Sequence, residues 1–338
     1  SVNIAHVNMD RILVVGSGSW GTALVKILLE NSRISVDWWV RSDKIAQKIN
    51  AEGKNPKYLR SVRLDTNRLK ASTDIEQLIS ANDYILLVTP SAFIADLLND
   101  ISSDQLKGKK IISAIKGVEP NSLKIVGEYL FENKGIKESD FGVITGPCHA
   151  EEVAQEKLSY LTFASTNQDF VDEICKVLRC QYISVLPSAD IYGTEIAAVL
   201  KNVYSIACGI CHSLGYGDNF QAVLVSNAIR EIKRFIEAVH PIDRDADDSA
   251  YLGDLLVTAY SQYSRNRTFG TMLGKGYAIS SALMEMEMIA EGYYATESIY
   301  KLNKEHKIYM PILDFVYQVV YANSNVKEEA KRLTQLLN

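Results

Sequence analysis

Residues 11–21 read Arg11-Ile-Leu-Val-Val-Gly-Ser-Gly-Ser-Trp-Gly21, a β-branched run followed by three spaced glycines. A helical stretch follows from Thr22 to about Glu30. A strand, a glycine loop and a helix in this order predict the first βα unit of a doubly wound sheet. There Gly16 permits a tight turn, Gly18 lets a pyrophosphate approach the backbone, and Gly21 lets the helix pack on the strand. The N–H groups at the helix start suit a phosphate, so the stretch predicts a dinucleotide site.

The alternation of strands and helices continues over the first half of the chain. Further strand-like runs lie at Val36–Val40, Tyr84–Val88, Lys110–Ala114, Phe141–Ile144, Tyr160–Ala164 and Tyr182–Leu186. Helical segments separate most of them, at Lys44–Ala51, Ile75–Ser80, Ala92–Leu98, Leu123–Phe131 and Phe170–Leu178. This order predicts an α/β Rossmann-type sheet, mostly parallel, with helices on both faces. Ligands bind at the carboxyl ends of such strands.

Past Asp190 the strand-like alternation stops and helical patterns dominate to Asn338. We expect loops at 214–219, 240–248 and 265–280, where the helical pattern breaks. The sequence therefore predicts two domains, a dinucleotide-binding domain over residues 1–188 and an all-helical substrate-binding and catalytic domain over 189–338. A chain of 338 residues is long enough for two separate cores.

Composition narrows the class of protein. The apolar share of 47% and the charged share of 23% are typical of soluble globular proteins. The net charge is −5 and no basic run stands out, so we expect no nucleic-acid partner. The longest uninterrupted apolar runs, such as Tyr84–Val88, are too short to span a bilayer, and the N-terminus does not resemble a signal peptide. We expect a cytoplasmic protein without a membrane span.

Cysteine usage does not indicate a disulfide framework or a metal site. Five cysteines in a chain of this size are few. Cys208 and Cys211 have the spacing of a metal or redox pair, but they lie in an apolar helical stretch and no second pair completes a zinc site. We therefore expect free thiols and no bound metal.

One lysine stands out in the helical half of the chain. The stretch Gly193–Ile210 is apolar almost all round, yet it contains Lys201. A helix of this kind is normally buried, and lysine is rarely buried without a partner. The positions that share its face are mostly small: Ala197, Ala198, Tyr204, Ser205 and Cys208. Two interpretations remain open from this stretch alone, a side chain that reaches back to water and a buried functional cation.

Two cations follow predicted strands directly. Arg41 ends the second strand, where an arginine suits the 2′-phosphate of NADP and an acidic residue would favour NAD. Lys116 follows the strand that ends at Ala114 and precedes a glycine, so it points toward the ligand edge of the sheet. A surface arginine and an ordinary loop lysine are the alternative interpretations.

Charged residues also gather in the helical half. Asp254 stands in an apolar segment, where a carboxylate is either a helix cap or the partner of a buried cation. Ser264-Arg-Asn-Arg267 follows, and an arginine beside an amide suits capture of a phosphate or carboxylate. A solvated basic loop is the alternative. Glu291 precedes Gly292 late in the chain, where a capping role is the default.

Together these motifs resemble the bacterial type of NAD(P)-dependent glycerol-3-phosphate dehydrogenases over almost the whole chain. The lysine motif and the Ser-Arg-Asn-Arg motif are far more specific than the glycine loop. The matching blocks, in order, are Gly16–Leu24, Ile115–Gly117, Gly146-Pro147 with Ala150, Glu195–Asn202, Gly253–Leu255 with Thr258, Ser264–Arg267 with Phe269-Gly270, and Glu291-Gly292.

The resemblance implies a role for each matched residue. Lys201 would exchange the proton, with Lys116 and Asp254 as its catalytic partners. The substrate would be bound by Lys116, Asn202, Thr258, Arg265 and Asn266. The cofactor NAD(P), with NADP favoured by Arg41, would be bound by Gly16, Gly18, Ser19, Trp20, Gly21, Arg41, Lys116, Ala150, Arg265, Ile289 and Glu291. The implied reaction interconverts dihydroxyacetone phosphate and sn-glycerol 3-phosphate for glycerophospholipid synthesis, in a homodimer.

Three positions depart from the family pattern. Cys148 and His149 stand where the family has a hydroxyl residue and phenylalanine, and Tyr251 replaces a glycine. None of them removes a charged group, so we expect activity. Two alternatives remain, a dehydrogenase of another phosphorylated or carboxylated hydroxy substrate and a non-catalytic nucleotide sensor with the same fold.

Overall fold

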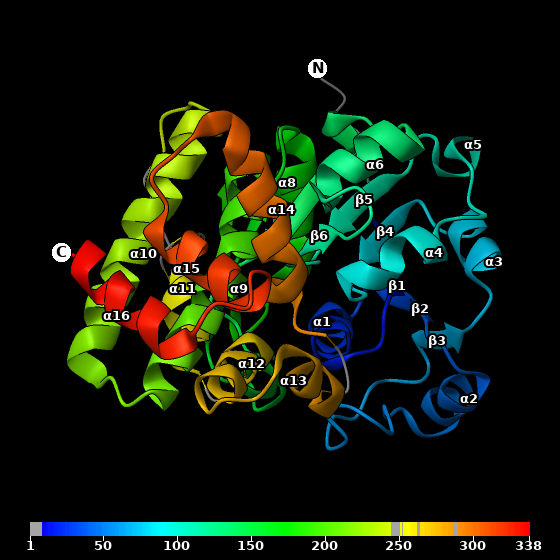
Figure 1. Ribbon diagram of the computed structural model, residues 1–338. Coiled ribbons are helices and arrows are strands. Elements are labelled where there is room, and N and C mark those ends of the chain that lie inside the picture. The colour runs from blue at the N-terminus through cyan, green and yellow to red at the C-terminus, as the bar shows by residue number, and fades with distance from the viewer. Residues whose placement is uncertain (1–8, 245–250, 252, 262–263, 287–288) are drawn as a thin grey trace. The chain divides into compact units, whose positions relative to one another are not determined.

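The computed structural model describes residues 9–244, 251, 253–261, 264–286 and 289–338 (Figure 1). The chain divides into two compact units. The first unit comprises Ser1–Ile115, Gly127–Ile144 and Cys148–Ile191. The second comprises Tyr192–Asn338 together with two short segments from the first half of the chain, Lys116–Val126 and Thr145–Pro147.

An eight-stranded sheet forms the centre of the first unit, in the order β10-β9-β8-β5-β4-β1-β2-β3. From β3 to β8 the paired strands run parallel. Strands β9 and β10 are parallel to each other. Ser165 Oγ, just after β9, donates to the carbonyl of Phe141 at the start of β8, so β9 runs opposite to β8. The strands are β1 (Arg11–Val15), β2 (Ser35–Trp39), β3 (Leu69–Ser72), β4 (Tyr84–Leu87), β5 (Lys110–Ser113), β8 (Phe141–Thr145), β9 (Ser159–Ala164) and β10 (Ile183–Ser188).

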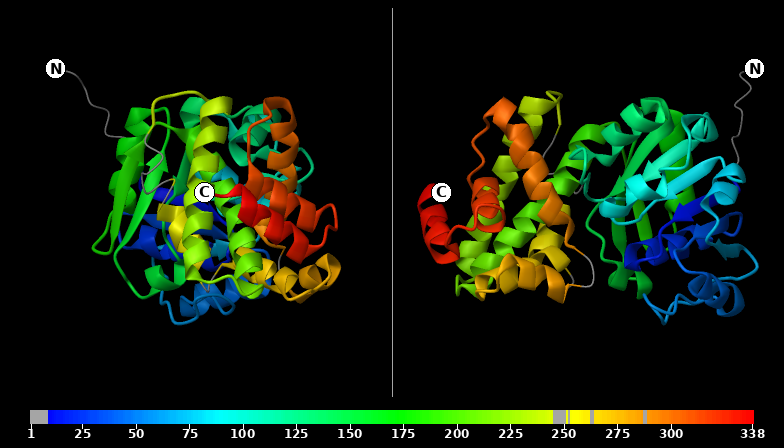
Figure 2. Two further views of the ribbon diagram at one scale, coloured as in Figure 1. Left: turned by 60° about the vertical axis from the view of Figure 1, so that its left-hand side comes forward. Right: turned by 45° about the vertical axis from the view of Figure 1, so that its right-hand side comes forward.

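Helices cover both faces of this sheet (Figure 2), and the central strands β4 and β8 are therefore buried on both sides. On one face Ile12, Val14 and Leu86 pack in a core shared with α1 and α8. On the other, Val15, Ile85 and Leu87 meet side chains of α3, α5 and α6. The helical segments are α1 (Ser19–Leu29), α2 (Asp43–Glu52), α3 (Ile75–Ser80), η1 (Ser91–Phe93), α4 (Ile94–Leu97), α5 (Ser103–Leu106), α6 (Val126–Lys134), η2 (Glu138–Asp140), α7 (Ala150–Ala154) and α8 (Gln168–Leu178).

The edge strand β3 is partly closed by a side chain. Asn50, on α2, donates through Nδ2 to the carbonyl of Ala71 at 2.9 Å and accepts from the N–H of Ala71 at 2.7 Å. The carbonyls of Arg68 and Ser72 accept from the neighbouring strand β2. The amide of Asn50 therefore pairs with the outer side of β3 as a neighbouring strand would.

Among the residues that the structure describes, the regular elements of the second unit are helices and one small hairpin. Strands β6 (Val118–Glu119) and β7 (Lys124–Ile125) are antiparallel. Figure 2 shows its long helices side by side. The helices are α9 (Ile191–Ser213), α10 (Asp218–Val239), α11 (Asp254–Tyr260), α12 (Arg265–Gly274), α13 (Ile279–Glu285), α14 (Glu291–His306), α15 (Pro311–Val320) and α16 (Val326–Leu336).

The predicted fold class, a mostly parallel Rossmann-type sheet followed by a helical region, is confirmed. Some elements differ from the sequence prediction. The predicted helix at 123–131 begins later, at Val126, because β7 occupies the residues before it. The predicted loop at 265–280 is wrong over its first part, where α12 forms. Its glycines resemble helix breakers, but Gly270 and Gly274 lie where α12 packs closely against the backbone of α9.

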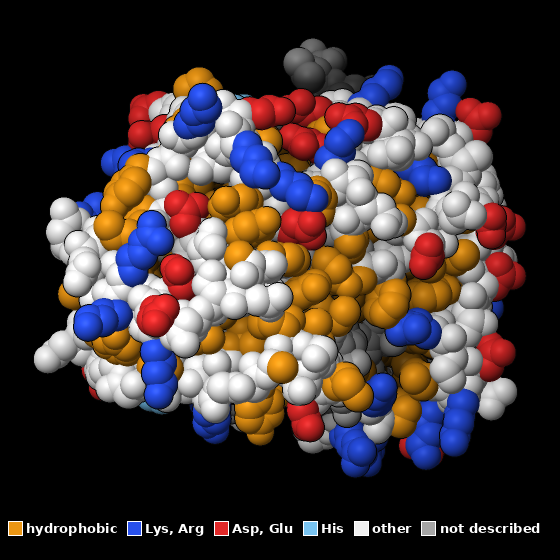
Figure 3. Space-filling model, viewed as in Figure 1, with side chains coloured by type: hydrophobic (Ala, Val, Ile, Leu, Met, Phe, Trp, Pro, Cys, Tyr) orange, Lys and Arg blue, Asp and Glu red, His pale blue; other side chains and the backbone are white. Residues whose placement is uncertain are grey.

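Helix α9 has the length and mean apolarity of a membrane span, although Glu195 and Lys201 interrupt its apolar sequence. In the structure, 89% of its most apolar 18-residue stretch is buried inside the protein, as expected of a core helix. It is the only such helix among the described residues. On the face drawn in Figure 3, side chains of both charge signs are interspersed.

Candidate functional site

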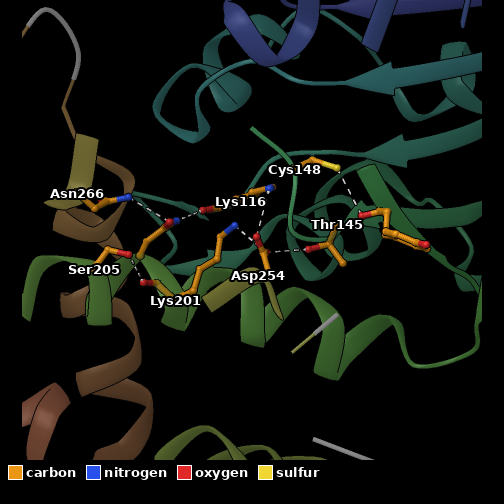
Figure 4. Close-up of polar contacts among 9 residues, drawn as sticks. Lys116, Thr145, Cys148, Lys201, Ser205, Asp254 and Asn266 are labelled. Carbon is orange, nitrogen blue, oxygen red and sulfur yellow. Dashed lines mark hydrogen bonds and ion pairs between the residues drawn. The ribbon is translucent and has the colours of Figure 1, made fainter. Parts of the chain in front are cut away.

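Lys201 is the centre of a buried cluster of charges in the second unit (Figure 4). Its Nζ lies 2.6 Å from Oδ2 of Asp254, and both side chains are at most 5% exposed. Lys116 Nζ lies 3.9 Å from the other oxygen, Oδ1. One carboxylate thus faces two lysines, and Asp254 is the partner of a buried cation. The alternative of a lysine that reaches back to water does not hold.

The local structure explains why α9 buries a cation. Most of its residues are apolar and pack in the core of the second unit, so the helix stays inside despite Lys201. Ser205 donates from Oγ to the carbonyl of Lys201 at 2.8 Å, one turn away on the same helix. The small side chains predicted to share this face are themselves buried: Ala197, Ala198 and Ser205.

Thr145 is a member of this cluster that sequence reasoning missed. It is the last residue of the buried strand β8, and its Oγ1 donates to Oδ2 of Asp254 at 3.3 Å. In Figure 4 it approaches the carboxylate from the side opposite to Lys201. The signal was available, because a hydroxyl residue directly before Gly146-Pro147 ends a strand at the ligand edge.

Burial lowers the pKa of Lys201 to about 7. The nearby Asp254 raises the pKa by charge and hydrogen bonding, while Lys116 lowers it further. Burial removes water that would stabilise the ammonium, and one shared carboxylate replaces that stabilisation only in part. A lysine with a pKa near neutrality can both donate and accept a proton under ordinary conditions.

Lys116 lies in the short segment that joins β5 to the hairpin β6–β7. Asn202 donates from Nδ2 to the carbonyl of Lys116 at 2.5 Å. Ser298, on α14, donates from Oγ to the carbonyl of Leu123 at 2.6 Å, which fixes the turn of the hairpin. Two helices of the second unit therefore hold the segment that carries Lys116, although the sequence places it within the first domain.

The start of α12 presents a charge and an amide with different exposure. Ser264 caps the helix by accepting from the N–H of Arg267. Arg265 is exposed at the first turn, whereas Asn266 is buried. Asn266 donates to Oδ1 of Asn202 at 3.1 Å and accepts from the N–H of Gly292 at 2.8 Å. The two amides thus connect the Lys116 segment, α9, α12 and the start of α14.

The remaining predicted residues of the second unit have separate positions. Arg267 donates to the carbonyl of Ala259 and so stabilises the link between α11 and α12. Glu291 is the first residue of α14, and Ile289 is 39% exposed just before it. The side chain of Thr258 lies outside the described residues.

The glycine loop of the first unit fits a dinucleotide pyrophosphate. A methyl group added at Gly16 would lie 2.8 Å from the backbone N of Thr89, and at Gly21 it would lie 2.5 Å from the carbonyl oxygen of Gly16. At Gly18 an added methyl would meet no protein atom within 4 Å. Packing therefore explains two of the glycines, and the open space at Gly18 suits a ligand that approaches the backbone.

Buried side chains hold this loop in place. Trp38 donates from Nε1 to the carbonyl of Gly16 at 2.7 Å. Asn55, which is almost fully buried, donates to the carbonyl of Ser17 and to Oγ1 of Thr22. No side chain caps the start of α1, which consists of Ser19 and Trp20, so its geometry also fits an incoming phosphate.

Arg41 is exposed just beyond β2, and its guanidinium lies 4.5 Å from the centre of the Phe93 ring. Ala150 is buried at the start of α7. Cys148, one of the departures from the family pattern, donates from Sγ to the carbonyl of Tyr160 at 3.4 Å. The thiol therefore packs within the first unit.

All five cysteines are free thiols, and Cys208 and Cys211 are buried in α9. Burial raises the pKa of both thiols to about 12, which makes them unreactive. Among the residues that the structure describes, no group of three metal-ligating side chains could hold a metal ion.

Two family models together match most of the chain. The model described as NAD-dependent glycerol-3-phosphate dehydrogenase N-terminus matches residues 11–171, and the C-terminus model matches residues 190–331. The glycerol-3-phosphate dehydrogenase [NAD(P)+] of Staphylococcus haemolyticus is 34% identical over 336 residues, which covers 96% of this chain and 98% of that protein. The Staphylococcus aureus protein of the same name is 34% identical over 333 residues, with 97% and 98% covered.

Solved structures show the same similarity. The crystal structure of glycerol-3-phosphate dehydrogenase from Coxiella burnetii aligns with a TM-score of 0.88 at 28% identity, over 96% of this chain and 99% of that one. The glycine loop, the two lysines that share the buried carboxylate of Asp254, and the full-length similarity agree with one another. The chain belongs to the NAD(P)-dependent glycerol-3-phosphate dehydrogenase family.

Proposed function

We propose that Lys201 exchanges the proton when this enzyme interconverts dihydroxyacetone phosphate and sn-glycerol 3-phosphate. The observation that carries the proposal is the buried contact between Lys201 and Asp254, with Lys116 on the other carboxylate oxygen. Reduction of the ketone adds a hydride to carbon and a proton to oxygen. NAD(P)H, when bound, supplies the hydride.

Both lysines act on the carbonyl oxygen of the substrate. As hydride reaches the carbon, negative charge grows on the former carbonyl oxygen, and an ammonium nearby stabilises it. Lys201 in its ammonium form then gives one proton to that oxygen and becomes a neutral amine. In the reverse direction the neutral amine takes the hydroxyl proton. Asp254 keeps both lysines in place and partly offsets their repulsion.

We assign substrate phosphate binding to Arg265 at the start of α12. The guanidinium is exposed there, and the positive end of the α12 helix dipole also favours an anion. Binding energy from the phosphate orients the three-carbon chain at a distance from the reacting carbon. Asn202 and Asn266 act largely through each other and through Lys116, so we assign them a positioning role beside any substrate contact.

We further propose that residues 1–188 bind the cofactor and that residues 189–338 bind the substrate, with the Lys116 segment contributing to the second. The glycine loop and Arg41 support the first assignment, and the position of Arg41 after β2 favours NADP over NAD. We also propose a cytoplasmic homodimer that supplies glycerol 3-phosphate for glycerophospholipid synthesis, on the basis of family membership.

The test is an absorbance assay of NADPH and NADH oxidation with dihydroxyacetone phosphate. Lys201→Ala should lower kcat by about 10²- to 10⁴-fold, the usual contribution of a general acid, with the fold intact by circular dichroism. Lys233→Ala, an exposed lysine on α10, is the control and should retain full activity. Turnover of Lys201→Ala at the wild-type rate would contradict the assignment.

A further inference from the structure

Helices α9 and α12 lie side by side and run in the same direction, with contacts that repeat every four residues. Asn202 meets Asn266 through their amides at 3.1 Å. One turn on, Gly270 packs on the carbonyl of Ile206, and a further turn on, Gly274 packs on the carbonyl of Ile210. In each of these three pairs the two residues are separated by the same number of positions in the sequence. The residues at i, i+4 and i+8 on α9 therefore lie along the residues at i, i+4 and i+8 on α12.

The backbones of the two helices touch at glycines from both sides. A methyl group added at Gly270 would lie 2.1 Å from the carbonyl oxygen of Ile206. A methyl group at Gly209 would lie 2.1 Å from the carbonyl oxygen of Arg267. Both glycines lie inside helices, where glycine is less favourable than alanine. Their absence of a side chain therefore serves this contact.

A third glycine closes the arrangement near the charged cluster. A methyl group at Gly292, at the start of α14, would lie 2.7 Å from the carbonyl oxygen of Asn202. The N–H of Gly292 donates to Asn266. The end of α12 that carries Arg265 and Asn266 is thus held near α9 by the hydrogen bond between the Asn202 and Asn266 amides, and one turn further on by the direct backbone contact at Gly270.

We propose that Gly209 and Gly270 are positioning residues that fix the distance between Lys201 and Arg265, and thereby the length of substrate that the enzyme accepts. The inference rests on the proposed function, in which one end of the substrate meets Lys201 and its phosphate meets Arg265. Gly270 lies four residues beyond Asn266, about 6 Å along the helix. A displacement of α12 at the glycine contact is therefore transmitted to the phosphate-binding end.

The first test is Gly270→Ala. The methyl group must push α12 away from backbone atoms that cannot rotate aside, and a misplacement of about 1 Å can cost about 10²-fold in rate. We expect kcat/KM for dihydroxyacetone phosphate to fall by about 100-fold, chiefly through KM. The much slower reduction of dihydroxyacetone, which lacks the phosphate, should change by less than about threefold, and the Kd of NADPH should not change.

Gly217→Ala is the matched control, because a methyl group there would meet nothing within 4 Å and φ is −85°. Gly209→Ala reaches the same contact from the other helix and should reproduce the effect of Gly270→Ala. Equal losses with dihydroxyacetone and with its phosphate would overturn the proposal, because they would indicate general disruption of the site. So would an unchanged KM in a folded Gly270→Ala variant.

A second measurement uses the wild-type enzyme and does not depend on a variant that folds. A fixed distance predicts that 1-hydroxybutan-2-one 4-phosphate, which is one methylene longer than dihydroxyacetone phosphate, is reduced at least about 100-fold less efficiently. Comparable efficiency with both substrates would overturn the proposal. If the wild-type enzyme reduces neither phosphate, the proposed function itself fails, which distinguishes the two cases.

Discussion

The Nζ of Lys201 lies 2.6 Å from the Oδ2 of Asp254, and the same carboxylate lies 3.9 Å from the Nζ of Lys116. Two cations therefore share one anion in a site from which water is largely excluded. When both lysines are protonated the cluster carries a net positive charge. An anionic substrate and the negative charge that develops on its oxygen complete the balance, which a neutral substrate could not do as well.

The lowered pKa of Lys201 sets the direction of the pH dependence. Its pKa is about 7, so the ammonium needed to reduce the ketone is lost as pH rises through that value. We expect kcat/KM for dihydroxyacetone phosphate to fall above pH 7 and kcat/KM for glycerol 3-phosphate oxidation to rise. In Asp254→Asn the carboxylate that raises this pKa is gone, so both transitions should move to lower pH. Unmoved transitions in steady-state pH profiles would exclude Lys201 as the titrating group.

Arg265→Ala should impair substrate binding more than chemistry. Loss of a hydrogen bond to a charged group costs about 1.5–3 kcal/mol, which corresponds to a rise in KM of about 10- to 100-fold. Lys275→Ala removes an exposed cation at the other end of α12 and should leave KM unchanged. Initial rates against substrate concentration measure both, and a similar KM in the two variants would rule out Arg265 as the phosphate ligand.

Gly18→Ala should separate cofactor binding from folding. The added methyl group meets no protein atom, and φ is −74°, so the melting temperature should not change. The methyl group would occupy the approach of the pyrophosphate, at a cost of about 1–3 kcal/mol by analogy with overpacked sites. We expect a weaker Kd for NADH and NADPH by fluorescence titration. Gly21→Ala is the contrast, because its methyl group would collide with the carbonyl of Gly16 and destabilise the fold.

Arg41→Ala should affect the two nicotinamide cofactors differently. An arginine after the second strand pairs with the 2′-phosphate that only NADP(H) carries, so KM for NADPH should rise by about tenfold or more while KM for NADH changes little. Lys107→Ala, an exposed lysine elsewhere in the first unit, is the control. Equal effects on both cofactors would mean that Arg41 does not read the 2′-phosphate.

The burial of Glu231, which has no role in the proposed reaction, predicts that the stability of the protein depends on pH. It accepts hydrogen bonds from Tyr204 and from the N–H groups of Ile312 and Leu313 at the start of α15. Burial raises its pKa from 4.5 to about 8 despite these bonds. Between these two values the native state holds a proton that the unfolded state has released, so the free energy of unfolding should fall as pH rises, by up to about 1.4 kcal/mol per pH unit.

Glu231→Gln should remove this slope, because the amide does not titrate, whereas Glu237→Gln on the exposed side of α10 should keep it. Denaturant unfolding at pH 5, 6.5 and 8 measures the slope. A wild-type slope in Glu231→Gln would assign the effect to another group.

Much of the sheet was predictable because its strands are apolar runs between glycine-rich or polar turns. Strand β3 was missed, since Leu69-Lys-Ala-Ser72 lacks β-branched residues and is only four residues long. The hairpin β6–β7 was missed because two-residue strands leave no periodic pattern. Both depend on tertiary contacts that a local pattern does not record.

The charged groups of the site were predictable as residue types, and their grouping was predictable only in part. Lys201 and Asp254 stand out as ionic residues in apolar stretches. Thr145 contacts Asp254 across 109 residues of chain. Asn202 donates to the carbonyl of Lys116 across 86 residues. Such contacts are set by how the segments fold together, and the spacing of residues along the chain does not encode them.

The pairing of the Asn50 amide, on α2, with the edge strand β3 affects how the protein behaves at high concentration. An open edge strand is a template on which a second chain can polymerise by sheet extension. Here the N–H and carbonyl of Ala71 are already engaged by Asn50 from within the same molecule. One side chain therefore takes up the pairing groups of Ala71 and shortens the stretch of this edge on which another chain could add.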